Sequence, residues 1–175
     1  SVSPSCVRVL DYHADIVIAS ASKYLSGHGD STGGYIAGNR TLLTEIENHC
    51  LMLGCVLSPM DAASILKGTR TLEVRMEKHS QNAMEVASFL KSHSKVSHVF
   101  YPGLPHHPTF DLAKKQMKRF GGMFYFSLNT DFQGCIRFLN HIRLTYLSFS
   151  FGGSMTLLEH PASMSYLGLS PVKKN

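Results

Sequence analysis

Apolar positions near the start of the chain group into two short strands separated by a glycine-rich loop. Residues 15–20 read Asp-Ile-Val-Ile-Ala-Ser, an apolar run that ends in a small polar residue and is typical of a buried strand in a parallel sheet. Residues 21–34 have no periodicity and contain four glycines, which predicts a loop that turns tightly or approaches another group closely. Residues 35–38 are expected to form the next strand, and residues 42–50 place their apolar positions at helical spacing.

The middle of the chain has the pattern of a long helical segment. Ser58 is a good helix cap, Pro59 suits the first turn, and Asp61 lies near the positive end of the helix dipole. The helical pattern continues, with an expected break at Gly68, to about Lys91. One apolar stripe within it is expected to face a core and consists of Leu72, Met76, Ala83, Val86, Ala87 and Leu90.

The second half of the chain mixes strand and helix patterns. Residues 96–101 and 123–128 are expected to be strands, and residues 109–119 a helix. Asp131 is a candidate cap for a further helix, and residues 144–151 have the pattern of another strand. The first part of the chain therefore looks α/β and parallel, and the second part α+β.

Composition and charge exclude several classes of protein. Of 175 residues, 43% are hydrophobic and 17% charged, which excludes a disordered chain and a coiled coil. No apolar run approaches the roughly 18 residues of a membrane span. The net charge of +5 has one dense group, Lys114, Lys115, Lys118 and Arg119. This group alternates with apolar residues at helical spacing, so a solvated helix face is favoured, and we expect neither a membrane nor a nucleic-acid partner.

The cysteines and histidines give no metal signature. The four cysteines form no C-x-x-C pair, and none lies at zinc-ligand spacing from a histidine. The adjacent pair His106-His107 is flanked by prolines and is typical of a surface loop. We therefore expect no metal site, and reduced thiols in a cytoplasmic protein fit this use of cysteine best.

The stretch that points most directly to chemistry is Ser20-Ala21-Ser22-Lys23. It joins the first expected strand to the glycine-rich loop, and ligand sites in open α/β sheets lie at the carboxyl ends of strands. A lysine there can bond covalently to a carbonyl ligand, and hydroxyl groups can donate hydrogen bonds to a phosphate. The alternative is a surface lysine in a polar loop, and spacing alone favours that alternative.

Residues 15–29, D-I-V-I-A-S-A-S-K-Y-L-S-G-H-G, closely resemble the pyridoxal-phosphate attachment motif of the Cys/Met metabolism (transsulfuration) family. The similarity covers nearly the whole chain, through residues 57–62, 66–72, 75–79, 101–105, 113–117, 121–123, 150–153 and 159–164. The resemblance implies the α/β fold of fold-type-I pyridoxal-phosphate-dependent transferases. Residues 1–70 are then the C-terminal part of the large, parallel-sheet, cofactor-binding domain, and residues 71–175 most of the small α+β C-terminal domain, both incomplete. His28 and Asp30 match the motif, and a structural role in the loop is expected for both.

The same resemblance assigns roles to individual residues. Lys23 is expected to carry pyridoxal 5'-phosphate and, once substrate is bound, to move protons as a base. Ser20 and Ser22 are expected to bind the cofactor phosphate, with Ser22 in the place of a family threonine, so that only a methyl group is lost. Ser150 and Phe151 are expected to position the substrate carboxylate.

For the full-length protein, the resemblance implies a carbon–sulfur lyase that eliminates a thiol from a sulfur amino acid such as methionine or cystathionine. Residues 25–30 and 56–59 are most similar to methionine γ-lyase and its relatives, which favours a lyase over a synthase. Cystathionine γ-synthase or β-lyase is the alternative, and a non-catalytic remnant that keeps only the fold or an oligomer surface is the alternative from another class. The family also implies a homotetramer. Because the chain resembles an interior segment, we expect the 175 residues alone to be inactive.

Overall fold

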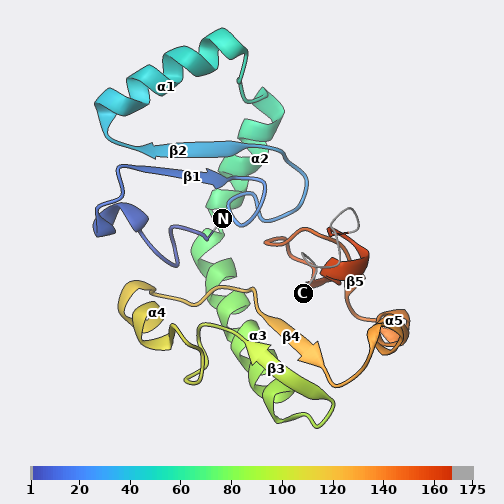
Figure 1. Ribbon diagram of the computed structural model, residues 1–175. Helices are drawn as coiled ribbons and strands as arrows, with labels where there is room; N and C mark the ends of the chain where they lie inside the picture. The colour runs from blue at the N-terminus through green and yellow to red at the C-terminus, as the bar shows by residue number, and fades with distance from the viewer. Residues whose placement is uncertain (1, 167–175) are drawn as a thin grey trace.

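The structure, a computed structural model, describes residues 2–166, and its longest helix, α3, runs through the middle of the molecule (Figure 1). The β1–β2 pair, α1 and α2 lie at one end of this helix, β3 and β4 lie toward the other, and α4 lies beside it (Figure 1). From the N-terminus the elements are η1 (Val9–Tyr12), β1 (Ile16–Ser20), β2 (Gly34–Gly38), α1 (Arg40–Leu53), α2 (Pro59–Thr69), α3 (Leu72–Ser92), β3 (Val96–Phe100), α4 (Phe110–Gln116), β4 (Tyr125–Leu128), α5 (Phe132–His141), β5 (Tyr146–Leu147), β6 (Leu157–Leu158) and η2 (Pro161–Ser163).

The first two strands form an antiparallel hairpin. β1 pairs with β2 in a register that places Ser20 opposite Gly34. The loop between them is closed by the backbone N–H groups of Ala21 and Ser22, which donate to the Gly33 carbonyl at 2.8 and 3.3 Å. This closure returns the chain directly beside β1, whereas a parallel pairing needs a crossover segment. The expected parallel pairing is therefore wrong for these two strands, and no residue of β1 is fully buried.

The long helical segment consists of two helices, α2 and α3, as the sequence predicts. Ser58 caps α2, because its hydroxyl accepts a hydrogen bond from the Asp61 backbone N–H at 3.1 Å. The break falls at residues 70–71, just after the expected position. Gly68 completes the last turn of α2 against the loop that follows β1, where an added Cβ would lie 2.1 Å from the Ser26 carbonyl oxygen. This close approach of helix and loop requires glycine.

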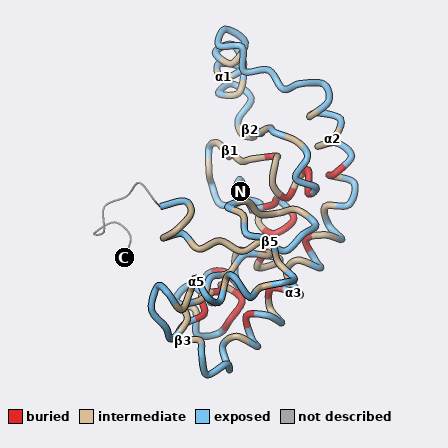
Figure 2. The backbone as a smooth tube through the Cα atoms, turned by 90° about the vertical axis from the view of Figure 1, so that its right-hand side faces the viewer, coloured by how far each residue is buried: buried red, intermediate tan, exposed pale blue. Residues whose placement is uncertain are grey.

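Small side chains of α3 allow β3 and the chain after it to pack closely on the helix. One buried cluster lies where α3 packs on β3 and the chain after it (Figure 2), and consists of Ala83, Ala87, Val99, Tyr101 and Leu104. Val86 was expected on the same stripe but is 45% exposed, since it lies about 100° round the helix from its buried neighbour. The stripe is therefore narrower than the sequence predicts.

The expected strands of the second half are confirmed as β3 and β4, which pair antiparallel. The expected helix over residues 109–119 is shorter, because α4 ends at Gln116. Beyond the helix, the Lys118 backbone N–H donates to the Cys6 carbonyl at 2.7 Å. The chain after α4 therefore pairs with the N-terminal segment instead of continuing the helix.

The region after β4 contains one confirmed helix cap and a shorter strand than expected. The Asp131 side chain accepts a hydrogen bond from the Gly134 N–H at 2.8 Å and caps α5. Of residues 144–151, only Tyr146–Leu147 form a strand, which pairs in parallel with β6. The Ser148 N–H still donates to the Leu158 carbonyl at 3.0 Å. Ser150 instead contacts the loop after β1, so the expected longer strand is wrong.

Acidic residues of α3 bind one member of the basic group near α4. The Arg119 side chain is only 14% exposed, and its Nη1 and Nε lie 2.8 Å from Glu73 and 2.6 Å from Glu77. Nη1 also donates to the Ser5 carbonyl at 3.2 Å. The expected solvated helix face is therefore wrong for Arg119, which links the N-terminal segment to α3.

Residues 2–166 contain neither a membrane-spanning helix nor a cluster of metal-binding side chains. No helix among these residues is long and apolar enough to cross a membrane. No group of three or more His, Cys, Asp or Glu side chains in this part of the chain is arranged to hold a metal ion. The four cysteines, all within it, are free thiols.

Candidate active site

Lys23 lies in the loop directly after β1, where the Gly27 N–H donates to the Lys23 carbonyl at 2.8 Å and forms a turn. The Lys23 Nζ donates to the Ser150 hydroxyl at 2.9 Å and lies 5.2 Å from the centroid of the Phe151 ring. The second distance is within the range of a cation–π contact. The structure therefore brings three of the predicted site residues together, although 127 positions separate Lys23 from Ser150 in the chain.

A glycine lets the segment after Phe151 pass directly over the Lys23 backbone. Gly152 has a φ of 86°, in the left-handed region that other residues rarely adopt. A Cβ there would lie 2.7 Å from the Tyr24 nitrogen and 2.9 Å from the Lys23 carbonyl carbon. The sequence gives no role to Gly152, and the adjacent glycines 152–153 are the only signal that it offers.

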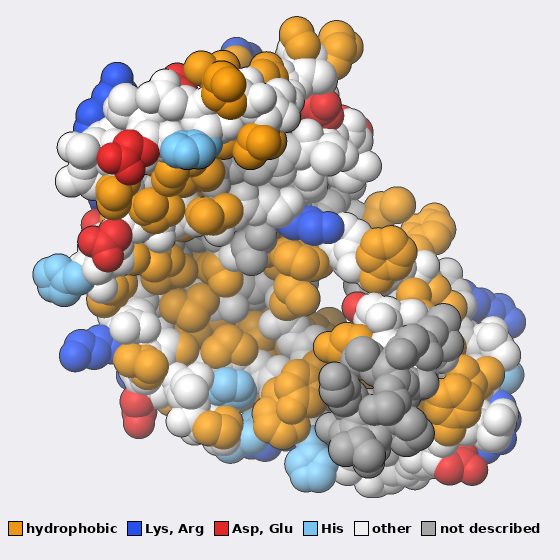
Figure 3. All heavy atoms as spheres, turned by 45° about the horizontal axis from the view of Figure 1, so that its top comes forward, with side chains coloured by type: hydrophobic (Ala, Val, Ile, Leu, Met, Phe, Trp, Pro, Cys, Tyr) orange, Lys and Arg blue, Asp and Glu red, His pale blue; other side chains and the backbone are white. Residues whose placement is uncertain are grey.

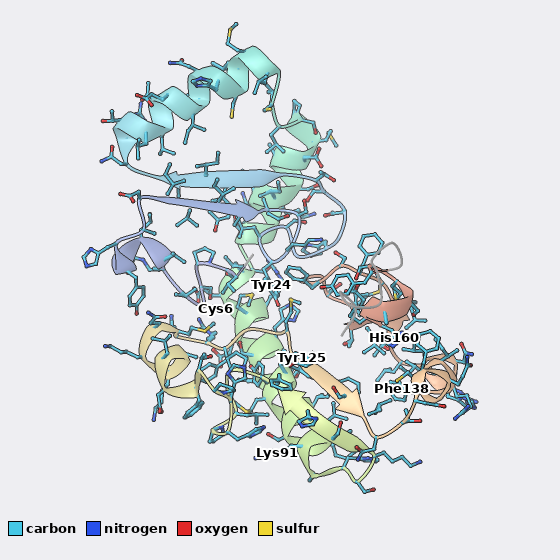
Figure 4. All side chains as sticks on the ribbon, viewed as in Figure 1. Cys6, Tyr24, Lys91, Tyr125, Phe138 and His160 are labelled. Carbon is cyan, nitrogen blue, oxygen red and sulfur yellow. The ribbon has the colours of Figure 1, made fainter. Side chains whose placement is uncertain are left out.

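Tyr24 forms a buried wall beside Lys23 and was also missed from the sequence. Its residue is 5% exposed, and its ring lies 5.6 Å from the His79 ring of α3 and 5.7 Å from the Phe151 ring. Figure 4 shows Tyr24 where the loop after β1 meets α3. Burial raises the pKa of Tyr24, and burial together with the positive charge of Arg75 lowers the pKa of His79. Both rings are therefore neutral at pH 7.

Ser20 and Ser22 both lie at the carboxyl end of β1. Ser20 is the last residue of the strand. The Ser22 hydroxyl accepts from the Gly33 N–H at 2.9 Å and donates to the Gly33 carbonyl at 3.3 Å, so that it closes the glycine-rich loop. Phosphate binding stays a prediction for both serines.

Ser26, His28 and Asp30 form hydrogen bonds with one another within the glycine-rich loop. The buried Ser26 hydroxyl donates to Asp30 at 3.1 Å. The His28 Nδ1 lies 2.7 Å from the Ser26 carbonyl oxygen. These contacts support the structural role that the sequence predicts for His28 and Asp30.

Comparison with known proteins identifies relatives along the entire chain. A family model described as Cys/Met metabolism PLP-dependent enzyme matches residues 1–175. An L-methionine gamma-lyase of Fusobacterium nucleatum subsp. polymorphum is 43% identical over 166 residues, which are 94% of this chain and 42% of the relative. A cystathionine beta-lyase of Coxiella burnetii is 40% identical over 174 residues, which are 98% of this chain and 45% of the relative. The chain thus spans less than half the length of these relatives.

A solved structure shares the fold. The crystal structure of cystathionine gamma synthase from Xanthomonas oryzae pv. oryzae in complex with cystathionine matches with a TM-score of 0.94 at 36% identity. The match covers 98% of this chain and 44% of that chain. The α/β, fold-type-I class expected from the sequence is therefore confirmed. The domain division at residue 70 stays a prediction.

Proposed function

The chain belongs to the family of Cys/Met metabolism PLP-dependent enzymes, and we propose that Lys23 carries the family's cofactor, pyridoxal 5'-phosphate, in an enzyme that acts on sulfur amino acids. The observation that carries this proposal is the 2.9 Å contact between Lys23 Nζ and Ser150 Oγ. It joins the expected cofactor lysine to the segment expected to position the substrate. The alternative, a surface lysine in a polar loop, predicts an amine that points into solvent without such a contact.

The chemical groups around Lys23 fit the cofactor, which offers an aldehyde and a phosphate. Within residues 2–166, the Lys23 amine contacts a neutral hydroxyl and an aromatic face but no carboxylate, so no ion pair opposes a covalent bond to an aldehyde. The Ser22 proton can turn from the Gly33 carbonyl, at 3.3 Å, to a phosphate oxygen while the Gly33 N–H still donates to Ser22. Ser20, at the same end of the strand, supplies a second hydroxyl.

Bound pyridoxal phosphate withdraws electrons from the substrate α-carbon and so supplies the electron sink of the reaction. We assign the proton transfers to Lys23 Nζ. Once the amine of the substrate has taken the place of Lys23 on the cofactor, Nζ is free to take the proton from the α-carbon. Ser150 Oγ holds the Lys23 amine in place, since it already accepts a hydrogen bond from Lys23 Nζ. The Phe151 ring lies 5.2 Å from this amine, and the buried Tyr24 ring packs 5.7 Å from Phe151, so the two rings give this position one apolar side.

Elimination of a thiol from a sulfur amino acid, such as methionine or cystathionine, is the reaction that we propose. The 43% identity with a methionine gamma-lyase supports it. The likeness to a cystathionine beta-lyase at 40% identity and to a cystathionine gamma synthase at 36% supports β-elimination or replacement as the second candidate. All of these reactions use a lysine base, so Lys23 does not distinguish among them. A non-catalytic module is the candidate from another class.

The products distinguish these candidates. Protein produced from its complete reading frame and loaded with pyridoxal phosphate is incubated with methionine or cystathionine. Elimination releases ammonia, a 2-oxo acid and a thiol together, whereas replacement consumes an added thiol and releases no ammonia. A folded protein that holds the cofactor and forms none of these products contradicts the enzymatic proposal and favours the non-catalytic module.

We also propose that the whole protein is a cytoplasmic homotetramer that contacts neither membranes nor nucleic acid. Large hydrophobic side chains support association, since Ile18 is 74%, Met52 88% and Leu53 77% exposed. Figure 3 shows hydrophobic side chains spread over the face that it presents, a surface typical of a chain that another segment or subunit covers. The free cysteines support a reducing compartment. Light scattering tests the tetramer, and cell fractionation tests the location.

A further inference from the structure

The guanidinium group of Arg75 binds the loop that carries Lys23 to the junction of α2 and α3. Nη1 donates to the Tyr24 carbonyl at 2.8 Å, and Nη2 donates to the Leu25 carbonyl at 3.2 Å and to the Gly68 carbonyl at 2.8 Å. Nε donates to the Thr71 hydroxyl at 3.0 Å. One side chain of α3 thus joins the two residues that follow Lys23 to the last turn of α2.

Two glycines make room for this arrangement. A Cβ at Gly27 would lie 2.1 Å from the Arg75 Nη1, and a Cβ at Gly68 would lie 2.1 Å from the Ser26 carbonyl oxygen. Burial lowers the pKa of Arg75, and no carboxylate among residues 2–166 forms an ion pair with it. The charge of Arg75 is therefore directed at backbone carbonyl groups, which a planar guanidinium with several fixed donors binds better than an ammonium group does.

The loop carbonyls depend on Arg75 more than the helix end does. Gly68 also accepts hydrogen bonds from the backbone N–H and the hydroxyl of Thr71, at 3.2 and 3.3 Å. The carbonyls of Tyr24 and Leu25, by contrast, have Arg75 as their donor and no other within the described residues. Loss of Arg75 leaves two partly buried carbonyls without a donor, so the loop, rather than the helix, is expected to move.

We propose that Arg75 is a positioning residue for Lys23: by fixing the next two carbonyls, it holds the Lys23 amine beside Ser150, where a carbonyl ligand can react with it. The inference rests on the proposed function of Lys23. It adds a mechanical link, because a shift of the α2–α3 junction is transmitted through one guanidinium group to the loop of the reactive amine.

The test uses protein from the complete reading frame, loaded with pyridoxal phosphate, in the variants Arg75→Gln and Arg75→Lys. The first readout is the circular dichroism of the cofactor's visible band, which reports how the bound ring is held. The second is the separation of kcat from KM. We expect both variants to change the dichroism and to lower kcat by up to about 10²-fold, the effect of a displacement of about 1 Å, with little change in KM. Arg75→Lys is expected not to restore the dichroism or kcat, because lysine keeps the charge but lacks the planar guanidinium group with its several fixed donors.

Arg119→Gln is the matched control. Arg119 also binds a backbone carbonyl, that of Ser5, but its hydrogen bonds do not reach the loop of Lys23. This variant is expected to lower the unfolding midpoint while leaving dichroism and kcat unchanged. Normal dichroism and kcat in both Arg75 variants, a full rescue by lysine, or equal changes in the Arg119 variant would each overturn the proposal.

Two additions keep the test decisive. If the Arg75 variants do not fold, Thr71→Val removes the acceptor of Nε and the weak hydroxyl bond to the Gly68 carbonyl, but leaves the bonds of Arg75 to the Tyr24 and Leu25 carbonyls in place. A smaller change of dichroism in the same direction is expected. An unchanged spectrum in that variant contradicts the proposal. Borohydride treatment of the unaltered protein separates the two claims, because a cofactor band that is not bleached there contradicts the role of Lys23 itself, whereas a bleached band with unaffected variants contradicts only the role of Arg75.

Discussion

The Nζ of Lys23 donates a hydrogen bond of 2.9 Å to the Oγ of Ser150, across 127 positions of sequence. The contact is reinforced where Gly152 packs against the backbone of Lys23 and Tyr24. The loop after β1 and the segment after β5 therefore form one site. A change in either segment is expected to alter the other.

Ser150→Ala removes the hydroxyl that accepts from the Lys23 amine and that is expected to position the substrate carboxylate. A hydrogen bond to a charged group contributes about 1.5–3 kcal/mol, and the partial exposure of Ser150 favours the lower end. Loss of the bond to the carboxylate is therefore expected to raise the KM for the amino-acid substrate about 10-fold. Ser154→Ala, a change at an exposed serine four positions on, is the control and is expected to leave KM unchanged. Equal KM values in the two variants would contradict the positioning role of Ser150.

Ser22→Ala is expected to lower both the affinity for the cofactor and the stability of the glycine-rich loop. Loss of a hydrogen bond to a phosphate predicts roughly a 10- to 100-fold loss of cofactor affinity, measured by dialysis. Loss of the bonds to Gly33 predicts a decrease of about 1 kcal/mol in the free energy of unfolding. Ser22→Thr is expected to retain both, and Ser20→Ala is also expected to weaken cofactor binding.

Ser31→Ala is the control in the same loop, because the buried Ser31 hydroxyl has no hydrogen-bond partner in the described part of the chain. This variant is expected to change neither the affinity for the cofactor nor the free energy of unfolding. If Ser22→Ala holds the cofactor as tightly as Ser31→Ala does, the phosphate role of Ser22 is wrong.

Gly152→Ala is expected to disrupt the contact between the two segments. The new Cβ would meet backbone atoms of Tyr24 and Lys23 at 2.7 and 2.9 Å at a positive φ, which predicts a destabilisation of about 1–3 kcal/mol in denaturant unfolding. Gly153→Ala meets nothing within 4 Å and is the control. Equal unfolding midpoints for the two variants would show that the close approach at Gly152 is not part of the folded protein.

Cys6 predicts a loss of stability at high pH. Its residue is 1% exposed, and burial raises the pKa of the thiol to about 11, although the positive charge of Arg119 opposes the shift. An unfolded cysteine has a pKa of about 8.5, so the unfolded state loses its proton first as pH rises. The stabilising contribution is therefore complete below about pH 8.5 and is lost progressively up to about pH 11.

Urea unfolding from pH 8 to pH 11 (roughly the interval between the two pKa values) measures this effect. Cys6→Ala is expected to show a shallower decline of the free energy of unfolding than the unaltered protein. Identical slopes in the two proteins would assign the decline to other groups.

Local signals in the sequence predicted individual elements well. The side chain of Ser58 and that of Asp131 cap helices as their positions indicate. The direction of strand pairing was predicted wrongly, because the apolar run of residues 15–20 describes one strand and not its neighbour. The antiparallel pairing depends on the closure of the following loop at Gly33, which periodicity does not show.

Contacts between distant segments were beyond the reach of the pattern. Ser150 and Phe151 entered as site residues only through the family resemblance, and the pattern around them predicted a longer strand. The contacts of Arg75 and Gly68 with the loop after β1 were missed for a related reason, since a single arginine or glycine does not identify the backbone that it will approach. Such roles depend on two segments at once.

The central claim is that Lys23 carries the cofactor, and borohydride reduction tests it most directly. Protein from the complete reading frame is loaded with pyridoxal phosphate, reduced, digested and analysed by mass spectrometry. We predict one reduced adduct, on the peptide that contains Lys23, and none in Lys23→Ala. That variant is expected to keep its unfolding midpoint, because the Lys23 side chain lies in a loop and is only partly buried. An adduct on another lysine, or adducts spread over many, would contradict the account.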